Sequence, residues 1–523
     1  MRVGFVQARP SPPYYVGIDV GTSSLKVVLV DADGRVAGQQ SESYPLLIER
    51  QGWVEQDPRQ WWEALRHSFD RFWADGFSAS DVEGIGITGQ MHGLVMLDRS
   101  GSVIRPAILW NDQRTVAETL QLSSVVGREK ILQLTGSLPQ TGFTAPKLMW
   151  VRNQERPLFN RMWKFLLPKD YLGFLMTGEP FTDVNDASGT SLFDVGKRRW
   201  SYEIVDSLGL SPDLLPEVLE SPLSRGDLTR SAAELLGLRA GTPVAAGAGD
   251  QAAAGIGAGA VDDGPAFINL GTSGVVFTGL SAYKHDPEGR LHAFCHAVPD
   301  KWHLMGVMLS AGGALRWFRD ALGGVERQVG SLTGQDSYEI LIQEAAQVSP
   351  GSGALIFLPY LSGERTPHAD PFARGVFFGL SLLHGKPHMV RAVLEGVAFA
   401  IKDAVEIMKA INVNPSQFRA IGGGSRSGLW RQILADVLAR PVYQMPVEDA
   451  SAYGSSILGM VASRAFTGVE TAVDRTVKLG ELTSPNGSNS ETYGKQYEIY
   501  KRLYPALKEA YRSLENLSEF LHV

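Results

Sequence analysis

Cysteine is nearly absent from this sequence. Its 523 residues include one cysteine, Cys295, which cannot form an intramolecular disulfide. Such scarcity in so long a chain is typical of proteins that stay in a reducing compartment, so we expect a cytoplasmic protein. A disulfide-stabilised secreted domain is excluded.

Long apolar runs are missing as well. No run approaches the ~20 residues that span a bilayer. Gln7, Arg9 and Pro10 interrupt the N-terminal stretch before a signal-type core could develop. We therefore expect neither a membrane-spanning segment nor export, and residues 1–13, which end in a proline-rich stretch, are predicted to form a disordered leader.

The sequence also has no excess of positive charge. Lys and Arg total 49 against 56 Asp and Glu, for a formal net charge of −7, which disfavours a nucleic-acid or anionic-membrane partner. The composition, 44% hydrophobic and 20% charged, is that of a soluble globular protein. Because single cores split above roughly 250 to 300 residues, this length predicts two large domains.

What the sequence does contain is a repeated strand–turn–strand pattern. Tyr14 begins a run of two strands around a Gly-Thr-Ser turn, and residues 266–280, AFINLGTSGVVFTGL, repeat the pattern. Strands alternating with amphipathic helices predict an α/β fold with an internal duplication. We expect an N-terminal domain over residues 14–260, a C-terminal domain over 261–482 and a helical segment, 483–523, that packs back on the body.

The two Gly-Thr-Ser turns are candidate phosphate sites. Glycine lets backbone N–H groups approach a phosphate closely, and the hydroxyl groups add hydrogen bonds. Gly21 and Thr22 belong to the first turn, and Gly271 and Thr272 belong to the second. Asp19, just before the first turn, could hold a hydrated Mg²⁺ against nucleotide phosphates. Tight hairpin turns favour the same residues for structural reasons, so a purely structural role stays open for each turn.

A third glycine turn follows near residue 420. Gly422, Gly423 and Gly424 lie between a predicted strand and a predicted helix, a placement that suits a bound nucleotide. The Gly-Lys-Ser/Thr element of a Walker loop is missing, and GGGSRSG is not a dinucleotide fingerprint. A simple strand-to-helix turn is the alternative.

One carboxylate is surrounded by small residues. In AAGAGDQAAAGIGAGAV, glycine and alanine flank Asp250 on both sides, so a ligand could come close to it. Phosphoryl transfer needs a base aligned with the acceptor hydroxyl and a cation on the transferred group. Asp250 and Asp19 could divide these tasks. The local sequence alone favours Asp250 as a helix N-cap over a catalytic group, and it could be both.

Polar and aromatic residues gather in two neighbouring segments. Gln90, Met91 and His92 lie in a turn between strands, and Trp110 and Asn111 follow in ILWNDQRT. Sugar sites combine polar side chains that bind hydroxyls with an aromatic or apolar wall, and these segments supply both. His92 alone would more often be a structural histidine.

A group of histidines near Cys295 has spacing that permits zinc. The segment is predicted to be a strand and lacks a second cysteine, so we do not predict a metal site there. The residues concerned are His292, Cys295, His296 and His303.

Two long stretches resemble the FGGY carbohydrate kinases, relatives of actin and hexokinase. They are GFTAPKLMWVRNQ at residues 142–154 and GVFFGLSLLHGKPHMVRAVLE at 375–395, and the similarity runs from about residue 15 to 462. Four shorter motifs are most similar to the xylulokinase branch of that family. They are GQMHG at 89–93, ILWNDQR at 108–114, LPKDYL at 167–172 and PYLSGERTPH at 359–368.

The resemblance implies a two-domain actin-like (ribonuclease H-like) ATPase fold, with ATP, Mg²⁺ and a small sugar in the cleft between the domains. It implies that Asp250 is the catalytic base in transfer from ATP to O5 of D-xylulose. A homodimer is common in that family. The implied sugar-binding residues are Met91, His92, Trp110, Asn111, Asp250 and Gln251, and the implied nucleotide-binding residues are Asp19, Gly21, Thr22, Gly271, Thr272, Gly422, Gly423 and Ser427, with Asp19 on the metal.

Two positions depart from the family pattern. Gln113 stands where glycine is expected, and Gln251 follows Asp250 where asparagine is expected. Both are expected to reshape the sugar pocket, and Gln251 is where sugar preference would differ from the relatives. Two alternatives stay open: a kinase for ribulose, L-xylulose or glycerol, and a non-catalytic ATPase-fold sensor.

Overall fold

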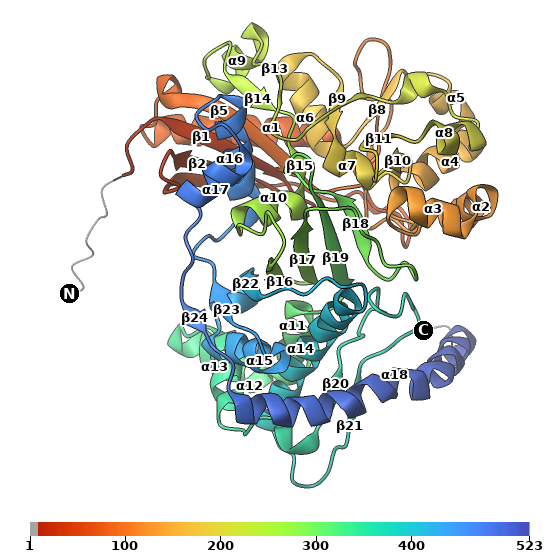
Figure 1. The fold of residues 1–523 in the computed structure, drawn as a ribbon, viewed down its shortest axis with the longest axis vertical. Helices are drawn as coiled ribbons and strands as arrows, with labels where there is room; N and C mark the ends of the chain where they lie inside the picture. The colour runs from red at the N-terminus through yellow and green to blue at the C-terminus, as the bar shows by residue number, and fades with distance from the viewer. Residues whose placement is uncertain (1–8, 522–523) are drawn as a thin grey trace.

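The computed structural model describes residues 9–521, which form two large mixed β-sheets with helices packed on both (Figure 1). Within this part of the chain, no helix combines the length and the apolar character that a bilayer crossing requires. Residues 1–8 of the predicted leader lie outside the described residues. Arg9, in contrast, donates to the carbonyl groups of Asp75 at 2.8 Å and Gly76 at 3.3 Å.

The first sheet has seven strands. Its strands, in order across the sheet, are β13 (Ser224–Asp227), β14 (Pro243–Ala245), β5 (Val82–Gly89), β1 (Tyr14–Val20), β2 (Ser24–Asp31) and β3 (Val36–Ser43), and β15 (Ala248–Gly249) pairs with β5. Every residue of β1 is buried, because helices cover both faces of the sheet. Helix α1 (Pro58–Ala74), whose N-cap is Asp57, packs against β2 and β3.

The second sheet repeats the pairing of the first. Its order is β18 (His292–Cys295), β19 (Trp302–Met308), β17 (Gly274–Leu280), β16 (Pro265–Leu270), β22 (Gln417–Ile421), β23 (Val442–Gln444) and β24 (Leu482–Thr483). In the first sheet β1 is antiparallel to β2 and parallel to β5, and in the second β16 is antiparallel to β17 and parallel to β22. The predicted α/β fold with an internal duplication is therefore confirmed.

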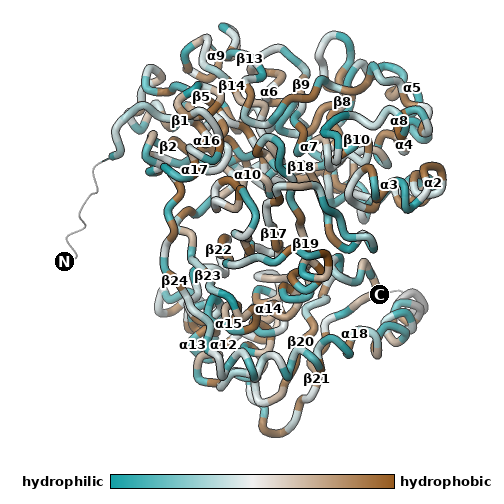
Figure 2. Tube along the Cα trace, in the orientation of Figure 1, coloured by the Kyte–Doolittle hydropathy of each residue, from teal (hydrophilic) through white to brown (hydrophobic). Residues whose placement is uncertain are grey.

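The second half is built around one long helix. The sequence predicts a helix from about Met389 to Met408, and α14 (Lys386–Ala410) is longer at both ends. It packs against β17, β19 and β20 (Ile356–Leu358), and Figure 2 shows hydrophobic residues along much of its length. Helix α18 (Gly487–Leu521) lies on α15 (Gly428–Leu438) and β20.

Helix α16 (Ala450–Ala462) crosses back to the first sheet, where it contacts β1 and β5. Glycines make this approach close: a Cβ atom at Gly17 would lie 1.9 Å from the carbonyl oxygen of Ala452, and one at Gly86 would lie 1.7 Å from that of Ser455. The helix therefore rests on the backbone of the sheet. The domain boundaries at residues 260 and 482 stay predictions.

Helix α10 (Asp250–Gly257) packs against α16 in the same backbone-to-backbone manner. A Cβ atom at Gly454 of α16 would lie 1.8 Å from the carbonyl oxygen of Ala253 in α10. A Cβ atom at Gly257 would lie 2.1 Å from the carbonyl oxygen of Ala450, so the end of α10 lies beside the start of α16, which Asp449 immediately precedes.

Candidate active site

Asp250 lies at the carboxyl end of β15, beside the end of β5. Ala248 pairs with Thr88, whose hydroxyl group donates to the Ala248 carbonyl at 2.7 Å. Gly249 occupies the N-cap of α10 and Asp250 is its first residue, so the N-cap alternative for Asp250 is wrong. Its carboxylate accepts instead from the backbone N–H of Gln251 at 2.9 Å and from the Gln251 amide at 3.0 Å.

The surroundings of Asp250 make it a stronger base than an exposed aspartate. Burial raises the pKa of the Asp250 carboxyl group to about 6, the nearby Asp449 adds to the rise, and the hydrogen bonds from Gln251 oppose it. The carboxylate is therefore ionised at neutral pH and still has appreciable affinity for a proton. A general base is most effective when its pKa lies near the working pH.

Asp19 and Asp449 lie near Asp250 and form a carboxylate cluster with it. Burial raises the pKa of Asp19 well above its ordinary value, and the charges of Asp449 and Asp250 raise it further. Lys26 pairs with Asp449 at 2.6 Å, and Asp449 caps α16 by accepting from the N–H of Ala452 at 3.0 Å. The sequence analysis missed Asp449, because an aspartate before a helix is ordinarily only a cap.

This cluster fits a divalent cation. Oδ1 of Asp19 is buried and has no hydrogen-bond partner among residues 9–521. A buried carboxylate oxygen without a donor is costly unless something positive compensates it. Mg²⁺ prefers oxygen ligands and usually binds through one or two carboxylates plus substrate phosphates. The Asp19 carboxylate matches that preference, whereas Asp449 is already bonded to Lys26 and to the Ala452 N–H group.

Hydrogen bonds join the first Gly-Thr-Ser turn to the predicted sugar segments. The indole N–H of Trp110 donates to the Thr22 hydroxyl at 2.9 Å, and that hydroxyl donates to the Gln90 side-chain carbonyl at 3.2 Å. Gln56, which the sequence analysis did not single out, donates to the Thr22 carbonyl at 2.6 Å. Oδ1 of Asn111 is buried and lacks a hydrogen-bond partner within the described chain, so it is free to accept from a ligand.

Met91 and His92 continue from the end of β5. A Cβ atom at Gly249 would lie 2.5 Å from Cγ of Met91, so Met91 contacts the backbone just before Asp250. His92 has a positive φ of 68°, stacks on Phe143 with ring centroids 4.2 Å apart, and has Nδ1 2.6 Å from the Gly189 carbonyl. Met91 and His92, both predicted for one site, thus lie at the same strand end.

The protonation state of His92 follows from this contact. Burial lowers the pKa of His92 well below its ordinary value, which the Gly189 carbonyl only partly opposes, so the ring is neutral. A carbonyl oxygen can only accept, so Nδ1 carries the proton and Nε2 is left as an acceptor. His92 is thus both fixed by the fold and able to bind a hydroxyl group.

The two departures from the family pattern lie in different places. Gln113 is exposed and its side-chain carbonyl accepts from the Thr141 hydroxyl at 2.8 Å. Gln251, in contrast, contacts the Asp250 carboxylate, and its Oε1 is buried without a hydrogen-bond partner in the described residues. Of the two, Gln251 is the one in contact with the candidate base.

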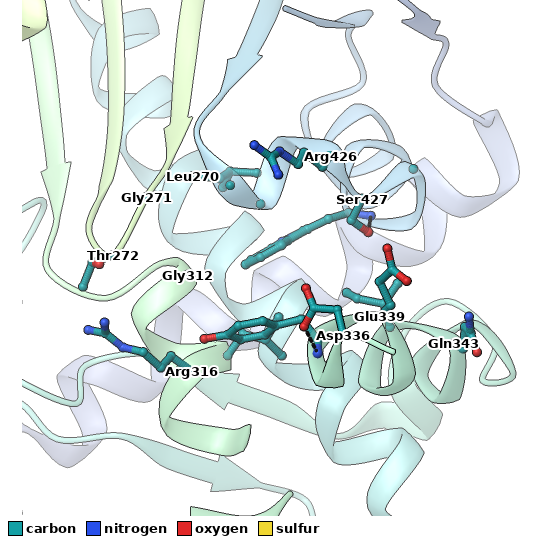
Figure 3. A pocket seen from close by; sticks show the side chains of 17 residues that line it. Leu270, Gly271, Thr272, Gly312, Arg316, Asp336, Glu339, Gln343, Arg426 and Ser427 are labelled. Carbon is teal, nitrogen blue, oxygen red and sulfur yellow. Dashed lines mark hydrogen bonds between the residues drawn. The ribbon is translucent and has the colours of Figure 1, made fainter. Parts of the chain in front are cut away.

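A second group of predicted residues surrounds a cavity of about 780 Å³ in the second half. Gly271, Thr272, Gly423 and Ser427 line it, and Figure 3 shows Thr272 at one end and Ser427 toward the other. Gly422 lies in an adjoining cavity of about 260 Å³ that shares Gly423 with the first.

Polar residues of two further helices also line the larger cavity, and the sequence analysis missed them. They come from α11 (Gly312–Leu322) and from the start of α13 (Ser337–Ala346), neither of which carries a recognisable motif. Figure 3 shows Arg316 below Thr272, with Asp336, Glu339 and Gln343 farther to the right along the same lower side of the cavity.

Comparison with known proteins matches most of the chain. Residues 14–257 match the N-terminal domain of the FGGY family of carbohydrate kinases, and residues 266–463 match its C-terminal domain. The chain is 40% identical to xylulose kinase from Escherichia coli (strain K12), over 94% of this chain and 99% of the relative. It is 34% identical to xylulose kinase from Bacillus subtilis (strain 168), over 96% and 99%.

A solved structure is similar over nearly the same length. The crystal structure described as a xyloylose kinase from Brucella ovis superposes with a TM-score of 0.88 at 38% sequence identity. The match covers 95% of this chain and 100% of that one.

Proposed function

The chain belongs to the FGGY family of carbohydrate kinases, and from that premise we propose that it transfers the γ-phosphate of ATP to O5 of D-xylulose. It is an ATP-dependent carbohydrate kinase with the actin-like fold of that family. The observation that carries the proposal is Asp250, a half-buried carboxylate with a raised pKa at the edge of a wall of candidate sugar-binding side chains. Relatives described as xylulose kinases support the choice of sugar.

Asp250 is the base in the proposed reaction. It accepts the proton of the O5 hydroxyl group as that oxygen attacks the γ-phosphorus; the new O5–P bond forms, the bond to the β-phosphate oxygen breaks, and ADP leaves. The glycine and alanine residues around Asp250 leave room for the sugar and the phosphate. Closure of the cleft would exclude water, which is a competing acceptor.

The sugar is held by side chains of residues 14–260. Nε2 of His92 and Oδ1 of Asn111 accept from sugar hydroxyl groups, and the indole of Trp110 with the Met91 side chain forms the wall. Gln251 orients the Asp250 carboxylate through the contact at 3.0 Å. Each acceptor is fixed by the fold, so the sugar can be bound in one orientation without any rearrangement of the site.

The nucleotide is held mainly by residues 261–482. Backbone N–H groups of Gly271 and Thr272, together with Gly21 and Thr22 across the cleft, bind the phosphates. Adenosine lies in the larger cavity near Gly422, Gly423 and Ser427. Asp19 would hold Mg²⁺, which would neutralise phosphate charge when bound.

The product identifies both the sugar and the position. We expect ³¹P and ¹³C NMR of a reaction with D-xylulose and ATP to show D-xylulose 5-phosphate, and a coupled ADP assay to rank D-xylulose above ribulose, L-xylulose and glycerol. Phosphorylation at another carbon, or a higher kcat/KM for one of the other acceptors, would contradict the proposed substrate.

Trp110→Ala should weaken sugar binding about tenfold, a loss of ~1.4 kcal/mol, and leave ATP binding nearly unchanged. The indole ring forms the sugar wall and its N–H fixes Thr22. Trp110→Phe, which keeps a ring but loses that N–H, should have a smaller effect. Calorimetric titration of each ligand separately measures both constants, and an equal loss for sugar and ATP would show that Trp110 does not line the sugar site.

Gly423→Val should raise the KM for ATP about tenfold while the KM for the sugar stays constant. A Cβ atom at Gly423 would meet no protein atom within 4 Å, so the side chain is tolerated by the fold but enters the nucleotide cavity. Gly487→Val, at another open position away from the cavity, is the matched control. Initial rates at varied ATP concentrations measure the KM for ATP in each variant. An unchanged KM for ATP in Gly423→Val would refute the assigned nucleotide site.

A cytoplasmic location and a homodimeric state stay predictions.

A further inference from the structure

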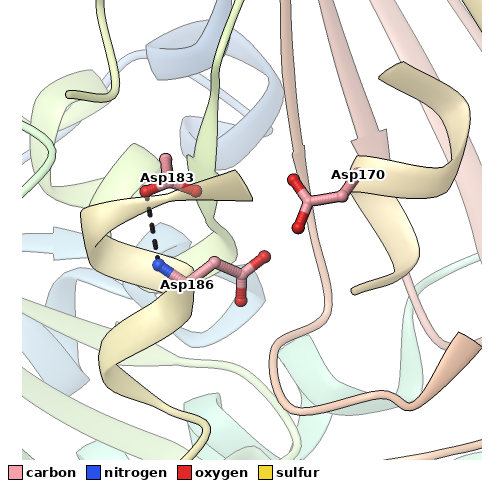
Figure 4. A group of neighbouring side chains, drawn as sticks. All are labelled: Asp170, Asp183 and Asp186. Atoms are coloured by element: carbon pink, nitrogen blue, oxygen red, sulfur yellow. Dashed lines mark hydrogen bonds between the residues drawn. The ribbon is translucent and has the colours of Figure 1, made fainter. Parts of the chain in front are cut away.

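A buried ion cluster fixes the short helix α7 (Val184–Ser188). Nζ of Lys169 lies 2.5 Å from Oδ1 of Asp170, 2.7 Å from Oδ2 of Asp183 and 3.4 Å from Oδ2 of Asp186, and all four side chains are buried. Figure 4 shows the three carboxylates facing one another. The Lys169 ammonium already occupies the position of a cation, so the cluster is a structural anchor and not a metal site.

The buried ion cluster holds α7 through Asp183, which is the N-cap of this helix. Oδ1 of Asp183 accepts from the N–H groups of Asn185 at 2.8 Å and Asp186 at 3.3 Å, and it also accepts from the Ser221 hydroxyl at 3.0 Å. The first turn of α7, and with it the Asn185 side chain, is therefore held in one place.

Asn185 uses both ends of its side-chain amide. Its Oδ1 accepts from the N–H of Gly249 at 2.8 Å, and its Nδ2 donates to the carbonyl of Cys295 at 2.7 Å. Gly249 directly precedes Asp250 in the first half, and Cys295 lies on β18 of the second sheet. One fully buried side chain thus joins the peptide before the candidate base to the second sheet.

The peptide between Ala248 and Gly249 is held at both of its polar atoms: its carbonyl accepts from the Thr88 hydroxyl at 2.7 Å, and its N–H donates to Asn185. Gly247 has a φ of +87°, and Gly249 has no side chain that could pack. Glycine backbone is less restricted than that of other residues, so the contact with Asn185 adds to the contact with Thr88 in fixing the orientation of the Gly249 N–H group. Without Asn185 that buried group also loses its only side-chain acceptor in the described chain.

We propose that Asn185 is a positioning residue for Asp250: it fixes the Ala248–Gly249 peptide, one residue before Asp250, and ties it to β18. The inference rests on the proposed role of Asp250 as the base. Asn185 itself touches neither the sugar nor the nucleotide in this account, so it acts on the rate through the direction of the Asp250 carboxylate.

Asn185→Ala should lower kcat about 10- to 100-fold, since a misplacement of about 1 Å in a reacting group can cost roughly 10²-fold. The KM for ATP should stay within about twofold, because the nucleotide cavity is built from other elements. The acid limb of the pH profile should also move to lower pH, because a carboxylate released toward solvent loses the effect of burial on its pKa. A role in stability alone would leave the pH profile unchanged.

Ser188→Ala is the matched control. The Ser188 hydroxyl accepts from the N–H of Cys295 at 3.2 Å, so its loss weakens the same contact between α7 and β18 without touching Gly249. Asn185→Asp is the conservative variant: in the protonated form that a fully buried site favours, one carboxyl oxygen still accepts from Gly249 and the O–H donates to the Cys295 carbonyl, so most of kcat should return. Thermal unfolding and ATP titration show which variants fold, and Asn185→Ser replaces Asn185→Ala if the latter does not.

The outcomes separate this inference from the proposed function. If Asp250→Asn is inactive while Asn185→Ala behaves like Ser188→Ala in kcat and in pH profile, the positioning role is wrong and the base assignment stands. If Asp250→Asn keeps wild-type turnover, the base assignment fails first. A lowered kcat with a shifted acid limb in Asn185→Ala, restored in Asn185→Asp, supports the inference.

Discussion

Asp250→Asn should lower kcat by about 10²- to 10⁴-fold, the range that general-base assistance usually supplies. Asparagine keeps the size of the side chain and can still bond to Gln251, but it cannot take the proton of the sugar hydroxyl group. The KM for ATP should change little. Steady-state rates with D-xylulose and ATP measure both quantities, and turnover close to wild type would contradict the assignment.

The pH dependence of the wild-type enzyme gives an independent check on Asp250. Catalysis needs the ionised carboxylate, so kcat/KM should fall as the pH drops through about 6, the value to which burial raises the pKa of Asp250. Asp250→Asn should lack this acid limb. An acid limb near the ordinary aspartate value of 3.8 would mean that the reacting carboxylate is not buried as described.

The stability of Asp250→Asn separates lost chemistry from lost structure. The pKa of this carboxyl group is near 3.8 in the unfolded chain and about 6 in the folded protein. Between these pH values the folded state binds more protons than the unfolded state, so the free energy of unfolding falls as the pH rises through that window. Above about pH 6 the neutral asparagine avoids this cost. The variant should therefore unfold at a temperature no lower than wild type at pH 8.

Gly86→Val should destabilise the fold by about 3 kcal/mol or more, the upper end of what overpacking costs. A Cβ atom at Gly86 would lie 1.7 Å from the backbone oxygen of Ser455, and backbone cannot move aside as a flexible side chain can. Helix α16 would have to lift from the first sheet, which would also displace Asp449 from the carboxylate cluster. Denaturant unfolding monitored by fluorescence measures the change.

Gly494→Ala is the control for this prediction. Gly494 lies inside α18, and a Cβ atom there would meet nothing within 4 Å. Alanine should therefore stabilise the protein slightly, by about 0.4 to 1 kcal/mol. If Gly86→Val is as stable as wild type, α16 does not rest on the sheet backbone at this position.

The sequence predicted the fold where the signals were local. The two Gly-Thr-Ser turns are flanked by strands that can be read directly, and they indicated the duplication that β1–β2 and β16–β17 display. The docking of α16 on β5 could not be predicted in this way. Gly86 and Ser455 are far apart in the chain, and an apolar helix pattern does not reveal which sheet it covers.

The same difference between local signals and long-range contacts applies to the residues of the candidate site. Asp250 stands out because small residues surround it, and the Trp110 segment stands out by its mixture of polar and aromatic groups. Asp449 and Asn185 look like ordinary helix-terminal residues in the sequence, and only their contacts with Lys26 and Gly249 link them to the site. Arg316 and Glu339 carry no motif at all, so only the cavity reveals them.

The most direct test of the account is ADP release measured with and without D-xylulose, in wild type and in Asp250→Asn. The account predicts that wild type releases ADP at a rate that depends on D-xylulose, and that Asp250→Asn shows only the slow sugar-free rate with or without the sugar. Equal ADP release in the presence and absence of every sugar tested would instead identify an ATPase without an acceptor, and would contradict the proposed function.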